Sequence, residues 1–175
     1  MNFQQFFDRL DALGADIPLA QLQTLLSELQ LAETDLADVT CFDPGQYLRN
    51  RIRQTDHYEV LLLCFAAGQR TPIHDHAGSA CGVKVIQGTA WETLFQRTED
   101  GWLFPTETRC LHAGGVVGSV DRDTHQLSNL QAGGKRLVTL HVYSPPLAEV
   151  GNYSLTSNEK ILVRAPTHDP LTIVC

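Results

Sequence analysis

The chain has 175 residues, of which 43% are hydrophobic and 19% are charged, the size and composition of a globular domain that can bury its own core. No apolar run approaches the length of about 20 residues needed to cross a bilayer. Thirteen basic against twenty acidic side chains give a net charge of -7, the wrong sign for binding nucleic-acid phosphates. We therefore expect a single domain over residues 1–175 and a monomer, with neither membrane nor nucleic-acid partners.

The N-terminal residues and the cysteines indicate the cellular setting. Residues 1–8 lack the basic region and the long apolar region of a secretory signal, which predicts a cytoplasmic protein. The five cysteines are an odd number without CxxC spacing. This pattern argues against a disulfide framework and a structural zinc site, and we expect most of the cysteines to be free thiols.

The first 31 residues predict two amphipathic helices. Apolar side chains recur at spacings of three and four along Phe3, Phe6, Phe7 and Leu10, and again along Leu19, Leu22, Leu25, Leu26 and Leu29. Gly14 and Pro18 separate the two segments. We expect this N-terminal helical segment, residues 1–31, to pack on a sheet.

The next segments have strand patterns. Arg49, Arg51 and Arg53 alternate, so that in an extended strand all three would share one face, and spacing alone selects none of them as functional. The run 58–67 is almost continuously apolar and rich in β-favouring residues, as is typical of a strand buried on both faces. Gly68 ends this run.

Short β-patterned pieces make up most of the remaining chain. They cover residues 82–87, 88–95, 107–111 and 135–143, separated by glycine, aspartate or proline. The pairs Gly114-Gly115 and Gly133-Gly134 predict turns. Regularly spaced short strands favour an all-β sandwich or barrel over alternating β-α units.

Two histidines stand two residues apart within one of these segments. In an extended strand His74 and His76 point to the same face while Asp75 faces away, a spacing typical of a metal site. A second alternating set, Thr139, His141 and Tyr143, also shares one strand face and can form a hydrogen-bonded relay that orients the tyrosine hydroxyl. On spacing alone, a half-buried strand with ordinary polar partners explains this second set better.

The stretch from Gly68 to Gly88 resembles the first motif of the cupin barrels. That motif has a glycine, five residues, His-x-His, four residues, one variable ligand, six residues and a glycine, and the variable position is Cys81 where most cupins carry glutamate. The segment from His125 to Asn129 resembles the end of the second cupin motif, without its usual Pro-x-Gly. The resemblance implies an all-β fold, a jelly-roll-like cupin β-barrel with N-terminal α-helices.

The same resemblance makes His125 the third ligand beside His74 and His76. Three neutral imidazoles would leave iron(II) its full charge, so that an anionic ligand would neutralise the site on binding, and zinc or copper would accept the same ligands. The remaining histidines lie in no motif and are expected at the surface or in structural roles; they are His57, His112 and His168.

From roughly Phe42 to Pro146 the chain resembles the cysteine dioxygenases, thiol dioxygenases of the cupin superfamily. Four ordered blocks carry the resemblance: Tyr47-Leu48-Arg49-Asn50, His74-Asp75-His76 to Gly88, His125 with Asn129, and His141-Val142-Tyr143-Ser144-Pro145-Pro146. It implies an iron(II) enzyme that converts L-cysteine and O2 to cysteine sulfinate, with iron held by His74, His76 and His125.

The resemblance also implies roles for the other residues of these blocks. Arg49, with Tyr47 beside it, would bind the substrate carboxylate, because a planar guanidinium suits paired hydrogen bonds to a carboxylate. Tyr143 would lie near the iron, oriented by His141 and then Thr139. Some members form a thioether between this tyrosine and a cysteine, and here Cys81 occupies the matching place; a buried free cysteine is the alternative.

Three other functions stay open at this point. A 3-mercaptopropionate dioxygenase is the nearest alternative, although that family has glutamine at the position of Arg49. A non-catalytic cupin that senses a metal or a small thiol would lack oxygen chemistry, and nothing in the sequence supplies it with a DNA-binding region. A metal-dependent isomerase or other cupin enzyme would have the glutamate ligand that Cys81 replaces.

Overall fold

The computed structural model describes residues 1–120 and 123–164. Its helices are α1 (Phe3–Asp11), α2 (Leu19–Glu28) and the 3-10 helix η1 (Glu33–Val39). Its strands are β1 (Leu48–Gln54), β2 (Glu59–Phe65), β3 (Ile73–His74), β4 (Ala80–Gln87), β5 (Thr89–Arg97), β6 (Leu103–His112), β7 (Val116–Ser119), β8 (Thr124–Ser128), β9 (Leu137–Ser144), β10 (Glu149–Ser154) and β11 (Ser157–Arg164).

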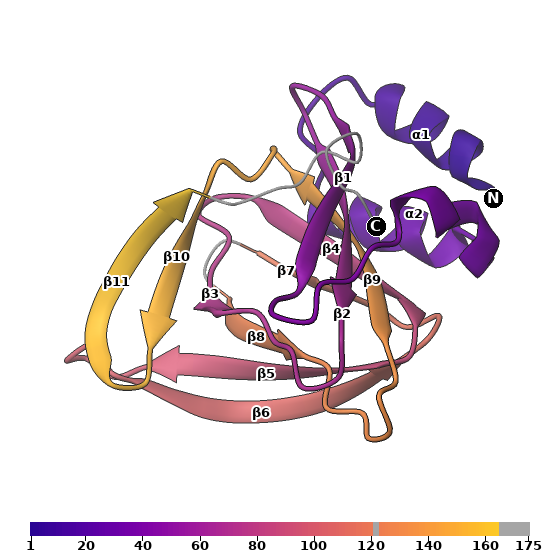
Figure 1. Ribbon diagram of the computed structural model, residues 1–175. Coiled ribbons are helices and arrows are strands. Elements are labelled where there is room, and N and C mark those ends of the chain that lie inside the picture. Colours follow the sequence, from indigo (N-terminus) through magenta and orange to yellow (C-terminus); the bar gives the residue numbers. More distant parts are fainter. Residues whose placement is uncertain (121–122, 165–175) are drawn as a thin grey trace.

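The strands form two antiparallel sheets that face each other as a barrel. One sheet has the order β1-β2-β9-β4-β7 and the other the order β11-β10-β3-β8-β5-β6. In Figure 1, α1 and α2 lie together beside the first sheet, and the long β5 and β6 strands of the second sheet lie at the bottom of the view. The predicted all-β barrel with N-terminal helices is confirmed.

Two strands of the first sheet are buried on both faces. Every residue of β2 and of β9 is buried. One face of this pair packs under the helices, where the shared core contains Phe6, Leu10, Leu22, Leu26, Val60, Leu62, Leu140 and Val142. The other face points into the barrel, where the core contains Leu61, Leu63, Phe65, Leu137 and Tyr143. The continuous apolar run at 58–67 is therefore explained by burial on both sides.

Helix α2 packs closely against β4 and β7 at two glycines, which have no side chain. Gly82 and Gly118 are cross-strand partners. A Cβ atom on Gly82 would lie 2.7 Å from Leu26 Cδ1, and one on Gly118 would lie 2.4 Å from Leu19 Cδ1. The buried Lys84 adds a polar anchor, because its Nζ donates to two carbonyls at the C-terminal end of α2, at 2.8 and 2.7 Å.

The last glycine of the His-x-His stretch is required by its surroundings. Gly88 has a φ of +82°, and a Cβ atom there would lie 2.4 Å from the Arg136 carbonyl oxygen. The predicted turns are also present, since Gly114, Gly133 and Gly134 have positive φ values between strands.

The prediction that Arg49, Arg51 and Arg53 share one face is wrong for Arg53. The β1–β2 register shifts between Arg51 and Arg53, so that Arg53 faces the helices and its Nη2 donates to Asp11 Oδ2 at 2.6 Å. A β-bulge turns the following side chain to the opposite face of the sheet. Arg49 and Arg51 remain on the face that points toward the barrel interior.

The expectation that the cysteines are free thiols holds for Cys64, Cys81 and Cys110, whereas Cys41 is disulfide-bonded. In the described part of the chain, no helix has the length and apolar character needed to span a membrane.

Candidate metal centre and substrate pocket

Three imidazoles meet between the two sheets. His74 on β3 is the cross-strand partner of His125 on β8, and His76 follows two residues after His74. The ring centroids are 4.7 to 5.3 Å apart, and one nitrogen of each ring lies within 4.8 Å of the others. All three side chains are buried. In the described residues, this is the cluster of His, Cys or carboxylate side chains that could hold a metal ion.

The neighbours of each ring leave the same nitrogen free. His74 Nδ1 donates to a backbone carbonyl two residues earlier at 3.0 Å, His125 Nδ1 donates to Glu92 Oε1 at 2.7 Å, and His76 Nδ1 contacts Ser119 Oγ at 3.3 Å. With Nδ1 engaged, each neutral ring offers Nε2 as a ligand, and the Nε2 atoms of His76 and His125 are buried without a hydrogen-bond partner. The donor set therefore fits a divalent transition metal.

Burial keeps the rings of His74 and His76 uncharged. It lowers the pKa of His74 to about 3 and the pKa of His76 well below its ordinary value, with the neighbouring His125 contributing in both cases. Neutral imidazoles at physiological pH do not have to lose a proton before binding a metal.

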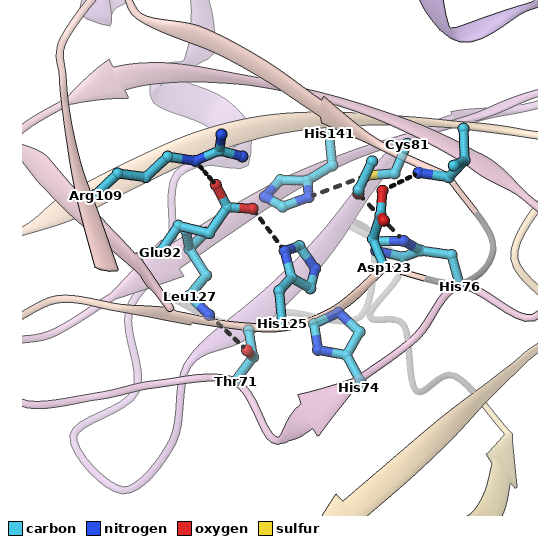
Figure 2. A network of polar contacts seen from close by, with 12 residues as sticks. Thr71, His74, His76, Cys81, Glu92, Arg109, Asp123, His125, Leu127 and His141 are labelled. Atoms are coloured by element: carbon cyan, nitrogen blue, oxygen red, sulfur yellow. Dashed lines mark hydrogen bonds and ion pairs between the residues drawn. The ribbon is translucent and has the colours of Figure 1, made fainter. Parts of the chain in front are cut away.

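A buried carboxylate that the sequence analysis missed stands behind His125. Glu92 on β5 accepts from His125 on one oxygen and from Arg109 Nε at 2.7 Å on the other, as Figure 2 shows. Burial alone would raise the pKa of Glu92, but the hydrogen bonds from His125 and Arg109 lower it, so the carboxylate stays charged. A single acidic residue in an otherwise β-patterned segment was the only signal for it in the sequence.

Asp75 holds the metal-binding loop from the other side. It faces away from the imidazoles, as predicted, and accepts hydrogen bonds from the Gly151 amide at 3.0 Å, the Tyr153 hydroxyl at 2.5 Å and Lys160 Nζ at 2.6 Å. These partners lie on β10 and β11. The loop that carries His76 is thus tied to the edge of the second sheet.

The alternating residues of β9 form a continuous hydrogen-bonded column in the barrel. Thr139 Oγ1 lies 2.9 Å from His141 Nε2, and His141 Nδ1 lies 3.2 Å from the Tyr143 hydroxyl. Burial, and after it the positive charge of Arg49, lowers the pKa of His141 well below its ordinary value. The ring is therefore neutral, and one of its nitrogens can donate a hydrogen bond while the other accepts one. The Tyr143 ring lies 5.7 Å from the His76 ring, next to the metal centre.

Cys81 is the cross-strand partner of Tyr143. Its Sγ lies 3.9 Å from His141 Nδ1, and burial raises the pKa of the thiol to about 12. A neutral thiol is a poor metal ligand, and Cys81 stands beside the tyrosine rather than in the three-histidine cluster. This is the arrangement that a thioether to Tyr143 would require.

Arg49 reaches the same interior space from β1. Its side chain is 5% exposed, and its guanidinium carbon lies 5.8 Å from the centre of the Tyr143 ring. Its Nε and Nη2 atoms are buried without a hydrogen-bond partner. Tyr47 stacks on Phe65 with ring centres 5.0 Å apart. A cavity of about 240 Å³ is lined by Tyr47, Arg49, Pro72, His74, Val150, Asn152, Val163 and Arg164.

Arg51, His57 and His112 have partners of their own. Arg51 Nε donates to Glu59 Oε1 at 3.1 Å. His57 is 45% exposed beside Asp16, and the exposed His112 contacts Thr89 Oγ1 at 3.1 Å. His168 lies outside the described residues.

The barrel and its three-histidine centre define a metal-binding cupin. Solved structures with this fold include a double-stranded β-helix domain protein of Klebsiella pneumoniae, with a TM-score of 0.54 and 18% identity over 71% of this chain and 97% of that one. The TT1209 protein of Thermus thermophilus aligns with a TM-score of 0.51 and 20% identity over 64% of this chain and 95% of that one.

A family model for cysteine dioxygenase type I matches residues 4–156, and the chain belongs to this family. It is 25% identical to human cysteine dioxygenase type 1 over 169 residues, which cover 91% of this chain and 82% of the relative. The enzyme of the same name from Danio rerio is 29% identical over 140 residues, covering 74% and 67%. The chain is therefore an enzyme of the dioxygenase class.

Proposed function

We propose that the protein is an iron(II)-dependent thiol dioxygenase that converts L-cysteine and O2 to cysteine sulfinate. The observation that carries this proposal is the pairing of three clustered, buried imidazoles, two of them with an unpaired Nε2, with a buried guanidinium that has two unpaired nitrogens. His74, His76 and His125 would hold the metal, and Arg49 would bind the substrate carboxylate.

The charge of the site supports an anionic thiol substrate. Three neutral ligands leave a divalent ion its full charge, and Arg49 adds another positive charge in the same buried space. A thiolate and a carboxylate on one small molecule would neutralise much of this charge, and both ends would be desolvated together. Iron(II), when bound, would lower the thiol pKa and activate dioxygen, which brings both reactants together.

The reaction adds both oxygen atoms of O2 to sulfur, so that R–SH and O2 become R–SO2H without a leaving group or an external reductant. Within this reaction we assign Tyr143 to hydrogen bonding rather than to proton abstraction. Burial, together with the nearby Cys81, raises the pKa of Tyr143 well above its ordinary value, so the phenol keeps its proton. His141 and Thr139 would orient that hydroxyl, and Tyr47 would shape the carboxylate end of the pocket.

A thioether between Cys81 and Tyr143 is a further part of the proposal, supported by their facing positions on β4 and β9. A single domain, a monomeric state and a cytoplasmic setting remain predictions.

The proposal is tested by oxygen uptake with a panel of thiols on the iron-loaded protein. We expect uptake with L-cysteine, and loss of bound iron in His74→Ala, His76→Ala and His125→Ala but not in the matched control His112→Ala. A fully metal-loaded wild type without thiol-dependent uptake would instead indicate a non-catalytic metal- or thiol-binding cupin.

The alternative substrate, 3-mercaptopropionate, is tested together with Arg49. The ratio of the wild-type kcat/KM values for cysteine and 3-mercaptopropionate decides between the two substrates. If Arg49 binds the carboxylate that both thiols carry, Arg49→Gln should lower kcat/KM for both of them. An unchanged kcat/KM would remove Arg49 from this role.

A further inference from the structure

Several buried side-chain nitrogen and oxygen atoms have no hydrogen-bond partner in the protein. In the described part of the chain they belong to Arg49, Asn50, Glu59, His76, His125 and Asn152. Asn50 faces the helices, where its Nδ2 donates to the Val39 carbonyl, and Glu59 already pairs with Arg51. Buried polar groups are nearly always paired in folded proteins, so the other four point to a ligand.

Three of these four residues are accounted for by the proposed function. The Nε2 atoms of His76 and His125 face the metal position, and Arg49 offers Nε and Nη2 to a carboxylate. The fourth is Asn152, whose Oδ1 has no partner. It was not singled out from the sequence.

The position of Asn152 places its side chain in the same space. On β10 it is the cross-strand partner of the candidate ligand His74. It is two residues from Val150, which belongs to the barrel core, so both side chains are on the inward face. Asn152 also lines the 240 Å³ cavity together with Arg49 and His74.

We propose that Asn152 determines substrate specificity, with its amide oxygen accepting a hydrogen bond from the amino group of the thiol substrate. This inference rests on the proposed function and deepens it, because it names the substrate class as α-amino thiol carboxylates. Arg49 would then bind the substrate carboxylate, and Asn152 would accept from one N–H of an amine whose nitrogen lone pair is left for the metal.

A neutral acceptor suits this position better than a charged one. A carboxylate at residue 152 would compete with the substrate for the Arg49 guanidinium, whereas an amide oxygen accepts from an N–H without opposing the carboxylate. A thiol without an amine would leave Oδ1 unpaired, and sites that hydrogen-bond a substrate N–H discriminate against analogues that lack it.

The test compares cysteine with 3-mercaptopropionate in the wild type, Asn152→Leu and Asn152→Ala. Both thiols carry a thiol and a carboxylate, so the ratio of their kcat/KM values isolates the amine. The exposed Asn158 on β11 provides the matched control, Asn158→Leu. Iron content and Tm establish that each variant is folded and loaded. The affinity for each thiol is also measured in the absence of oxygen, from the rise in Tm on adding the thiol, because this readout does not depend on turnover.

We expect the preference for cysteine over 3-mercaptopropionate to fall about tenfold in both Asn152 variants, the effect of one lost hydrogen bond, and to stay at the wild-type value in Asn158→Leu. An equal fall for both thiols, or an unchanged ratio, would overturn the inference. The wild type could bind cysteine more tightly than 3-mercaptopropionate, and the Asn152 variants could lose this difference in affinity, while no protein consumes oxygen with either thiol. In that case the proposed reaction fails and the role of Asn152 stands.

Discussion

Removing the Glu92 carboxylate should weaken metal binding without changing a ligand. Glu92 is 2% exposed and accepts the His125 Nδ1 proton at 2.7 Å. In Glu92→Ala this N–H has no acceptor, and the ring is free to rotate or to change tautomer. Hydrogen bonds to charged groups contribute about 1.5–3 kcal/mol, which corresponds to roughly 10- to 100-fold in affinity. That range agrees with the effect of outer partners on metal-binding histidines.

The assay is metal competition against a chelator, with the Tm of the metal-free protein as a folding control. Glu92→Gln keeps an oxygen that can accept from His125 but loses the charge, so its affinity should fall less than that of Glu92→Ala. The exposed Glu107 on the neighbouring β6 supplies the matched control, Glu107→Ala. Metal affinity within twofold of the wild type in a folded Glu92→Ala would refute the reasoning.

Three further predictions follow from other parts of the molecule. Lys84→Met removes both hydrogen bonds to the end of α2 and should lower the free energy of unfolding by about 1–3 kcal/mol in urea titrations, and an unchanged midpoint would exclude an anchoring role. Because the pKa of His74 is about 3 when folded, the unfolded chain binds the extra proton between pH 6.5 and 3. Stability of the metal-free protein should therefore fall as pH falls through this window, by up to about 1.4 kcal/mol per pH unit for this group, and His74→Gln should show a shallower slope. Intact-mass measurement after turnover should show a species lighter by two hydrogen atoms that is absent from Cys81→Ala, and unmodified Cys81 and Tyr143 after many turnovers would count against the thioether.

Much of the fold follows from local sequence patterns. The apolar periodicity of α1 and α2 and the continuous run of β2 identify these elements, because each is set by the face or faces that the segment buries. The pairing of His74 with His76 follows from alternation alone. The place of Arg53 does not, because a single-residue bulge in β1 reverses its face and leaves no mark in the spacing.

The layer of residues around the metal centre is the least predictable part. Glu92 reaches His125 because β5 and β8 are neighbours in the second sheet, although the two residues are far apart in sequence. Asn152 reaches the pocket because β10 pairs with β3 at His74. Such contacts depend on which strands are adjacent, and the order of strands in a sheet is a property of the whole fold. Neither residue lies in a motif that identifies its partner.

The most direct test of the central claim is the fate of isotopically labelled dioxygen with L-cysteine and the iron-loaded protein. The account predicts that oxygen and cysteine are consumed in equal amounts and that both oxygen atoms of the cysteine sulfinate carry the label. Cystine or peroxide as the product, or sulfinate with oxygen drawn from water, would contradict it.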